Sequence, residues 1–153
     1  MATQKQVGGI ALGVPGTLYG HNPATFYLPT PIAGAGGVTI GNFVWPDAEG
    51  AMVNKGTGTP SGVVVRVRVQ PLPSDEDATM LIPAGHAVPV LVRGPIILAS
   101  ASAASIGQKV FASLTTGAVS TAAAGATVEG HVETEFTVRT SAAAGAPFVA
   151  SRD

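Results

Sequence analysis

The stretch GVVVRVRVQP, at positions 62–71, bears most directly on the fold. Successive side chains of a β-strand point to opposite faces, so alternation of valine with polar residues predicts a strand with one buried face. The buried face would hold Val63, Val65, Val67 and Val69, and the other face Val64, Arg66, Arg68 and Gln70. We therefore predict a half-buried strand, whose outer face meets a neighbouring protein, and not a basic nucleic-acid-binding tail.

The composition also favours a half-buried strand over a nucleic-acid-binding tail. The chain has 153 residues, which is the size of one domain, and its formal net charge is -1. Charged residues make up 11% of it, against about 25% in ordinary soluble domains. A nucleic-acid-binding surface needs several cations on one face, and eight basic residues over the whole chain do not favour one. The chain lacks cysteine, which excludes disulfides and thiolate zinc sites.

From residue 38 onward the sequence is typical of β structure. Short runs rich in β-branched and aromatic residues alternate with Gly, Pro and Ser/Thr clusters, and no run has a helical period. Val92–Pro95 is interpreted as a tight reversal, and Leu114–Ala118 as a hairpin loop in which Gly117 takes a positive φ. We predict an all-β fold: a compact β-barrel or jelly-roll-like sandwich of short antiparallel strands. Residues 37–153 would form this single β domain.

Residues 1–36 are expected to form an extended, Gly/Pro-rich N-terminal arm. Four prolines within positions 15–31 preclude a regular helix or a central strand. The apolar content is nevertheless too high for a free tail, so the arm is expected to pack either on its own domain or on a neighbour. The residues that we assign to a contact with a neighbouring subunit are Leu18, Tyr19, Phe26, Tyr27 and Leu28. The start of the chain does not resemble a signal peptide, and no apolar run is long enough for a membrane span.

Motifs for chemistry are missing. No nucleophile motif or phosphate-binding loop has its required spacing, so we assign no catalytic residue. Glu129, His131, Glu133 and Glu135 alternate, which would place them on one face of a strand. Glu129, His131 and Glu133 are candidate metal ligands, but same-face neighbours stand nearly 7 Å apart, roughly two residue rises. A solvated acidic face is the preferred interpretation. Its Glu129, Glu133 and Glu135 could then pair with Arg66 and Arg68, either across strands or across subunits.

Several segments, in this order, resemble the structural cement (capsid decoration) proteins of tailed bacteriophages. They are HNPATF, GGVTIGNFVWPD, NKGTGTPSGVVVRVRV, MLIPAGHAVPVLVRGPIILA, GQKVFASLTTGAVS and ETEFTVRTSAAAGAPFVAS. The pieces that carry most of the resemblance are Gly41–Trp45, Gly58–Val65 and Gly107–Ala112. Together the segments span most of the chain.

The resemblance implies a non-enzymatic protein without a cofactor. Such proteins bind the outer surface of the expanded capsid and bridge neighbouring major capsid subunits. The expected partners are therefore the major capsid protein and further copies of this chain, as a dimer or trimer at a symmetry axis. The protein would be made in the host cytoplasm and located on the virion surface, without contact to nucleic acid or membrane.

The main alternative is a β-module that binds a receptor or a carbohydrate on a virion or cell surface. A sugar site would require exposed aromatic side chains, and the chain has few of them. Trp45, the only tryptophan, distinguishes the two interpretations. We expect it to belong to the core, because it lies next to an apolar strand.

Overall fold

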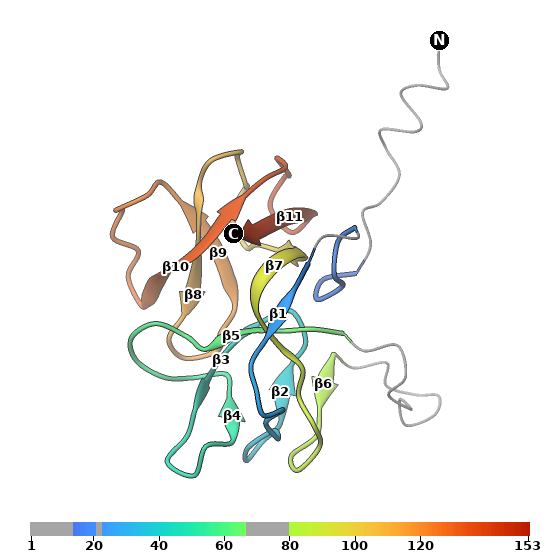
Figure 1. Cartoon of the computed structure of the whole chain (residues 1–153). Helices are drawn as coiled ribbons and strands as arrows, with labels where there is room; N and C mark the ends of the chain where they lie inside the picture. The colour runs from blue at the N-terminus through green and yellow to red at the C-terminus, as the bar shows by residue number, and fades with distance from the viewer. Residues whose placement is uncertain (1–13, 21–22, 67–79) are drawn as a thin grey trace.

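A computed structural model describes residues 14–20, 23–66 and 80–153 of the chain. The described residues form β-strands, turns and loops, and no helix among them is long and apolar enough to cross a membrane. Figure 1 labels the strands along the chain. They are β1 (Thr25–Phe26), β2 (Val38–Thr39), β3 (Phe43–Pro46), β4 (Met52–Val53), β5 (Gly62–Val64), β6 (Leu81–Ile82), β7 (Val90–Ala99), β8 (Lys109–Ser113), β9 (Val119–Ala122), β10 (His131–Val138) and β11 (Pro147–Arg152).

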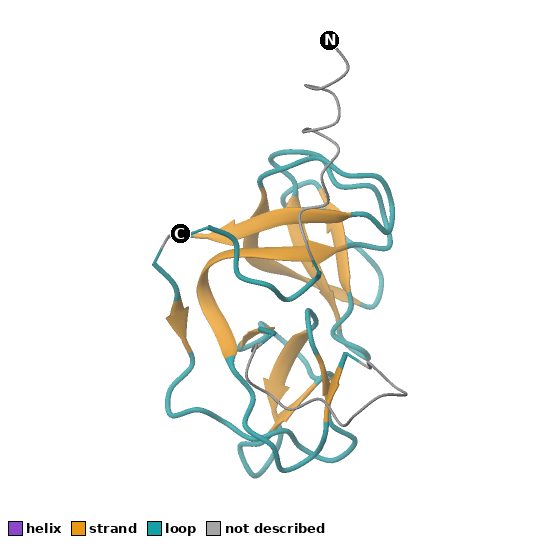
Figure 2. Ribbon diagram, turned by 90° about the vertical axis from the view of Figure 1, so that its right-hand side faces the viewer, coloured by secondary structure: helices purple, strands orange, loops and turns teal. Residues whose placement is uncertain are grey.

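The main sheet is antiparallel and curls into a half barrel (Figure 2). Its strand order is β4-β3-β5-β7-β11-β10-β8-β9, with β1 added beside β7, and β2 and β6 form a separate two-stranded sheet. The edge at β9 is covered, since Thr121 on β9 donates its hydroxyl to the Ala103 carbonyl at 2.9 Å. Covering an edge in this way removes a site of unwanted strand pairing. The all-β antiparallel fold expected from the sequence is confirmed.

Two hydrophobic clusters fill the molecule. The larger one lies under β8–β11 and includes Phe43, Phe136 and Phe148, and the Phe43 and Phe136 rings meet edge to face at 5.7 Å. The smaller one includes Val38, Val44 and Met52. In Figure 1, β8–β11 occupy the upper part of the view, and β2, β4 and β6 the lower part.

Strand β7 connects the two parts, and the tight reversal predicted at Val92–Pro95 is wrong. These residues lie inside one ten-residue strand. Gly94 has a φ of 129°, which a residue with a side chain rarely adopts, and this lets the strand change direction without ending. Gly-Pro pairs are typical of turns, but here β11 pairs with β7 from Gly94 to Ala99 and keeps the strand extended.

Strand β5 also differs from the prediction. It is three residues long, and Val63, Val64 and Val65 are all buried, so this part of the strand has no solvated face. The reason is that β5 lies between the two clusters: Val63 and Val65 belong to the larger and Val64 to the smaller. Arg66 is half-buried, while residues 67–70, with Arg68, lie outside the described part of the chain.

Other predictions are confirmed. Strands β8 and β9 form the expected hairpin around Leu114–Ala118, and Gly117 has a φ of 71°. Trp45 belongs to the core: it is 3% exposed, and its indole N–H donates to the Gly58 carbonyl at 2.9 Å. A buried tryptophan does not provide an exposed platform for a sugar ring.

Candidate functional site

Within the N-terminal segment, residues 16–19 and 25–27 lie along β7 of their own chain. Leu18 forms a β-bridge with Ile96, and Thr25 and Phe26 pair with Arg93 and Leu91. Beyond β1, the Tyr27 amide donates to the Val90 carbonyl at 2.9 Å. Figure 1 shows β1 lying against the yellow ribbon of β7. Of the two packing partners that the sequence left open for this segment, its own domain is the one that the structure shows.

The five residues assigned to a contact with a neighbouring subunit divide into two groups. Leu18 and Phe26 are partly buried and pack against the larger cluster. Tyr19, Tyr27 and Leu28 are 43%, 36% and 76% exposed. The inward side chains hold the segment in place, and the outward ones remain available to another molecule.

Exposed apolar side chains concentrate in this segment. Seven large hydrophobic residues are exposed in the described part of the chain, and five of them come from residues 14–20 and 23–32. These five form what we call the apolar strip: Val14, Tyr19, Tyr27, Leu28 and Ile32. Exposed apolar side chains that come from one short segment are a candidate surface for a protein–protein contact.

The acidic strand residues do not form a metal site. His131, Glu133 and Glu135 lie on β10, and Thr134, Phe136 and Val138 are buried on its other face. Glu129, however, lies in the turn before the strand, because the chain turns at Gly130 with a φ of 72°. Within residues 14–20, 23–66 and 80–153, no three His, Asp or Glu side chains are grouped so that they could hold a metal ion.

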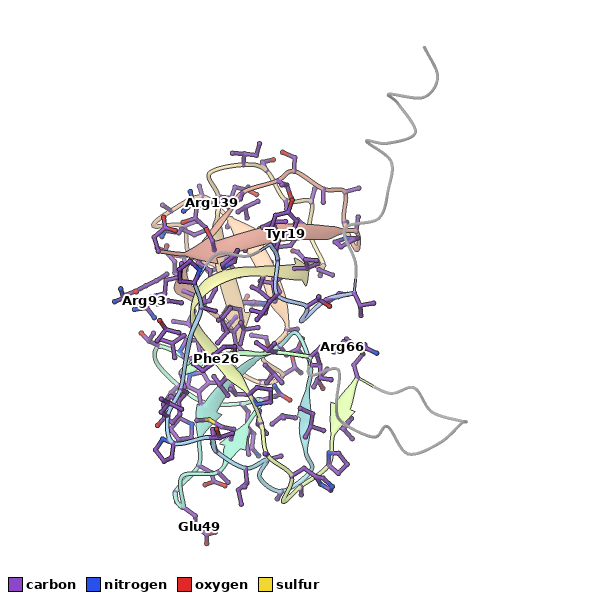
Figure 3. The ribbon with its side chains drawn as sticks, turned by 45° about the vertical axis from the view of Figure 1, so that its right-hand side comes forward. Tyr19, Phe26, Glu49, Arg66, Arg93 and Arg139 are labelled. Atoms are coloured by element: carbon purple, nitrogen blue, oxygen red, sulfur yellow. The ribbon has the colours of Figure 1, made fainter. Side chains whose placement is uncertain are left out.

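The acidic side chains have other partners than the two arginines expected. Glu133 accepts a hydrogen bond from the Gly125 amide at 2.7 Å, and Glu135 forms an ion pair with Arg152. Arg66 lies on another side of the molecule (Figure 3) and directs its guanidinium to the sulfur of Met80 at 3.4 Å. Pairing of Glu135 with Arg66 within one chain is therefore wrong, and pairing between chains stays a prediction.

Three arginines that the sequence analysis did not connect gather around one groove. We call it the arginine groove; its volume is about 530 Å³, and it is lined by Tyr19, Pro23, Arg93, Arg139, Arg152 and Asp153 among others. Arg93 belongs to β7, Arg139 directly follows β10, and Arg152 belongs to β11. In Figure 3 Tyr19, Arg93 and Arg139 lie in the same region of the surface. Positions so distant along the chain carry no shared sequence signal.

The half-barrel sheet thus carries an apolar strip and an arginine groove. A family model described as XM1 gp53 minor capsid protein matches residues 3–150. The chain belongs to this family.

A solved structure supports the fold assignment. A chain of "The capsid of Myoviridae Phage XM1" is similar to this one with a TM-score of 0.69 and 16% identity, over 94% of this chain and 92% of that chain. A comparison with curated proteins gave no match. The XM1 gp53 family consists of minor capsid proteins, which are structural components of a virion and not enzymes. The expected class, a phage capsid structural protein, is therefore confirmed.

Proposed function

We propose that this minor capsid protein is a cement protein. It binds the outer surface of a tailed-phage capsid, bridges neighbouring major capsid subunits and stabilises the expanded shell. The observation that carries the proposal is the apolar strip, which is exposed although its backbone is hydrogen-bonded to β7 at Tyr19 and Tyr27. Because the segment is already ordered, binding through it has a small entropic cost.

The charge of the chain supports the same function. With 11% charged residues, a broad contact with the shell requires the desolvation of few ionic groups. A capsid also repeats the same site many times. A dimer or trimer at a symmetry axis would engage several sites together, so weak individual contacts combine into strong attachment.

Exchange of two strip residues for polar ones tests the proposal. In a Tyr27→Ser, Leu28→Ser variant we expect shell binding to fall by about tenfold or more, since two apolar side chains would no longer be buried. The measurement is co-sedimentation of the full chain with capsids from which this protein is absent. The melting temperature should be nearly unchanged, because both residues are exposed in the free chain.

Ile106→Ser is the matched control. Ile106 is 69% exposed but lies outside the apolar strip, in the turn before β8. Its substitution should leave co-sedimentation unchanged. Undiminished binding of the strip variant, or an equal loss in the control, would contradict a contact through the strip.

A further inference from the structure

Among the residues that the structure describes, one cation of the arginine groove has no partner. Asp153 pairs with Arg139 at 3.0 Å, and Glu135 pairs with Arg152. The same two arginines also donate to their own chain, Arg139 to the Ser151 hydroxyl at 2.7 Å and Arg152 to the Val92 carbonyl at 3.4 Å. For the exposed Arg93, the described residues provide neither a hydrogen-bond acceptor nor a carboxylate.

The groove beside this cation has an apolar wall. Tyr19, Pro23 and Pro95 line it together with Gly94, which carries no side chain. A side chain at position 94 would come within 3.2 Å of Ala24, so the glycine lets the segment and β7 approach closely. The volume of about 530 Å³ is within the range of pockets that bind ligands. The site thus combines one unpaired guanidinium with an apolar surface.

We propose that the arginine groove binds an extended segment of a neighbouring shell protein, and that an Asp or Glu of this segment pairs with Arg93. This rests on the proposed cement function and names the chemistry of its partner. The planar guanidinium matches a carboxylate with two parallel hydrogen bonds. Apolar residues next to that carboxylate would lie against Tyr19 and the two prolines.

The charge balance of the groove favours a protein over a nucleic acid. Arg93, Arg139 and Arg152 are offset by Glu135 and Asp153, which leaves about one positive charge. A polyanion needs several neutralising cations in a row, whereas a single carboxylate needs one. Arg139 and Arg152, already held by their own carboxylates, shape the groove.

The test is charge reversal in the full chain, with co-sedimentation on shells that lack the protein. Arg93→Glu should weaken binding about tenfold or more, because attraction is replaced by repulsion, and Arg93→Lys should weaken it less. Lys55→Glu reverses the charge of another exposed residue, outside this groove, and should bind like the unaltered chain. Thermal unfolding of the Arg93→Glu variant should be unchanged, since Arg93 is exposed.

The outcomes separate this inference from the proposed function. If the unaltered chain fails to bind shells, the cement function itself is wrong. If it binds and Arg93→Glu binds equally well, or Lys55→Glu is equally weakened, only the groove inference is overturned. Binding to a double-stranded DNA oligonucleotide that depends on Arg93, with shell binding unaffected, would also overturn it. In a cryo-electron-microscopy map of decorated shells, a neighbour's carboxylate should lie within about 4 Å of the Arg93 guanidinium.

Discussion

Single residues decide the geometry of the turns in this protein. Gly117 closes the β8–β9 hairpin with a φ of 71°. Its amide donates a hydrogen bond to the Ser113 carbonyl at 2.9 Å, and its carbonyl accepts one from the Phe43 amide at 2.8 Å. A Cβ at this position would overlap the Phe43 carbonyl oxygen. The glycine therefore serves both the turn and the contact between the hairpin and β3.

Gly117→Ala is predicted to destabilise the fold by about 1–3 kcal/mol, from left-handed strain together with the overlap. Gly125→Ala is the matched control. Gly125 has a φ of 78°, but a Cβ there would meet nothing within 4 Å, so only the strain of about 1 kcal/mol applies. Urea denaturation measures both. Equal losses in the two variants would contradict the role of the contact with Phe43.

At the scale of elements, the segment from residue 14 to residue 36 is both structural and exposed. It pairs with β7 and covers part of the larger cluster through Leu18 and Phe26. Deletion of the segment would therefore remove core contacts as well as the apolar strip. Point substitutions separate these two roles, because Leu18 and Phe26 are partly buried whereas Tyr19, Tyr27 and Leu28 are exposed.

Phe26→Ala is predicted to cost about 2 kcal/mol, less than a fully buried phenylalanine because Phe26 is only partly buried. Leu28→Ala, two residues further along, should change stability by no more than about 0.5 kcal/mol, since Leu28 is 76% exposed. The midpoint of urea unfolding reports the difference. A larger effect of Leu28→Ala than of Phe26→Ala would show that the orientation of the segment is wrong.

At the scale of the whole molecule, the two hydrophobic clusters share two strands, β5 and β7. β5 contributes Val63 to one and Val64 to the other, and β7 does the same with Leu91 and Val90. Each cluster therefore depends on strands that also contribute to the other cluster. The chain should therefore unfold as one cooperative unit.

Substitutions in the two clusters test this cooperativity. Met52→Ala, in the smaller cluster, should cost about 2–5 kcal/mol, and Phe148→Ala, in the larger, about 3–5 kcal/mol. In each variant, far-ultraviolet circular dichroism and Trp45 fluorescence should give coincident unfolding curves. A separate early transition in Met52→Ala, with Trp45 fluorescence unchanged, would indicate that the two clusters unfold independently.

Much of the β8–β9 and β10 region could be predicted because the signals are local. The hairpin at Leu114–Ala118 follows from turn residues between two apolar runs, and the inward Phe136 and Val138 follow from alternation. Three of the five strip residues, Tyr19, Tyr27 and Leu28, were also identified from the sequence, whereas Val14 and Ile32 were not. For Val64, however, the pattern of alternation predicted a solvated face, because sequence cannot show that a second cluster covers it.

The sequence by itself determined that the chain is an antiparallel β protein with few charged residues, since strand period, turn chemistry and composition are properties of neighbouring residues. The capsid class came from the resemblance of its motifs to a known family. Only the tertiary structure decided that β7 passes through Gly94 without a turn, and that the N-terminal segment lies along it. It alone brought Arg93, Arg139 and Arg152 to one groove. Such contacts depend on which strands become neighbours in the sheet, and that depends on the packing of both clusters together.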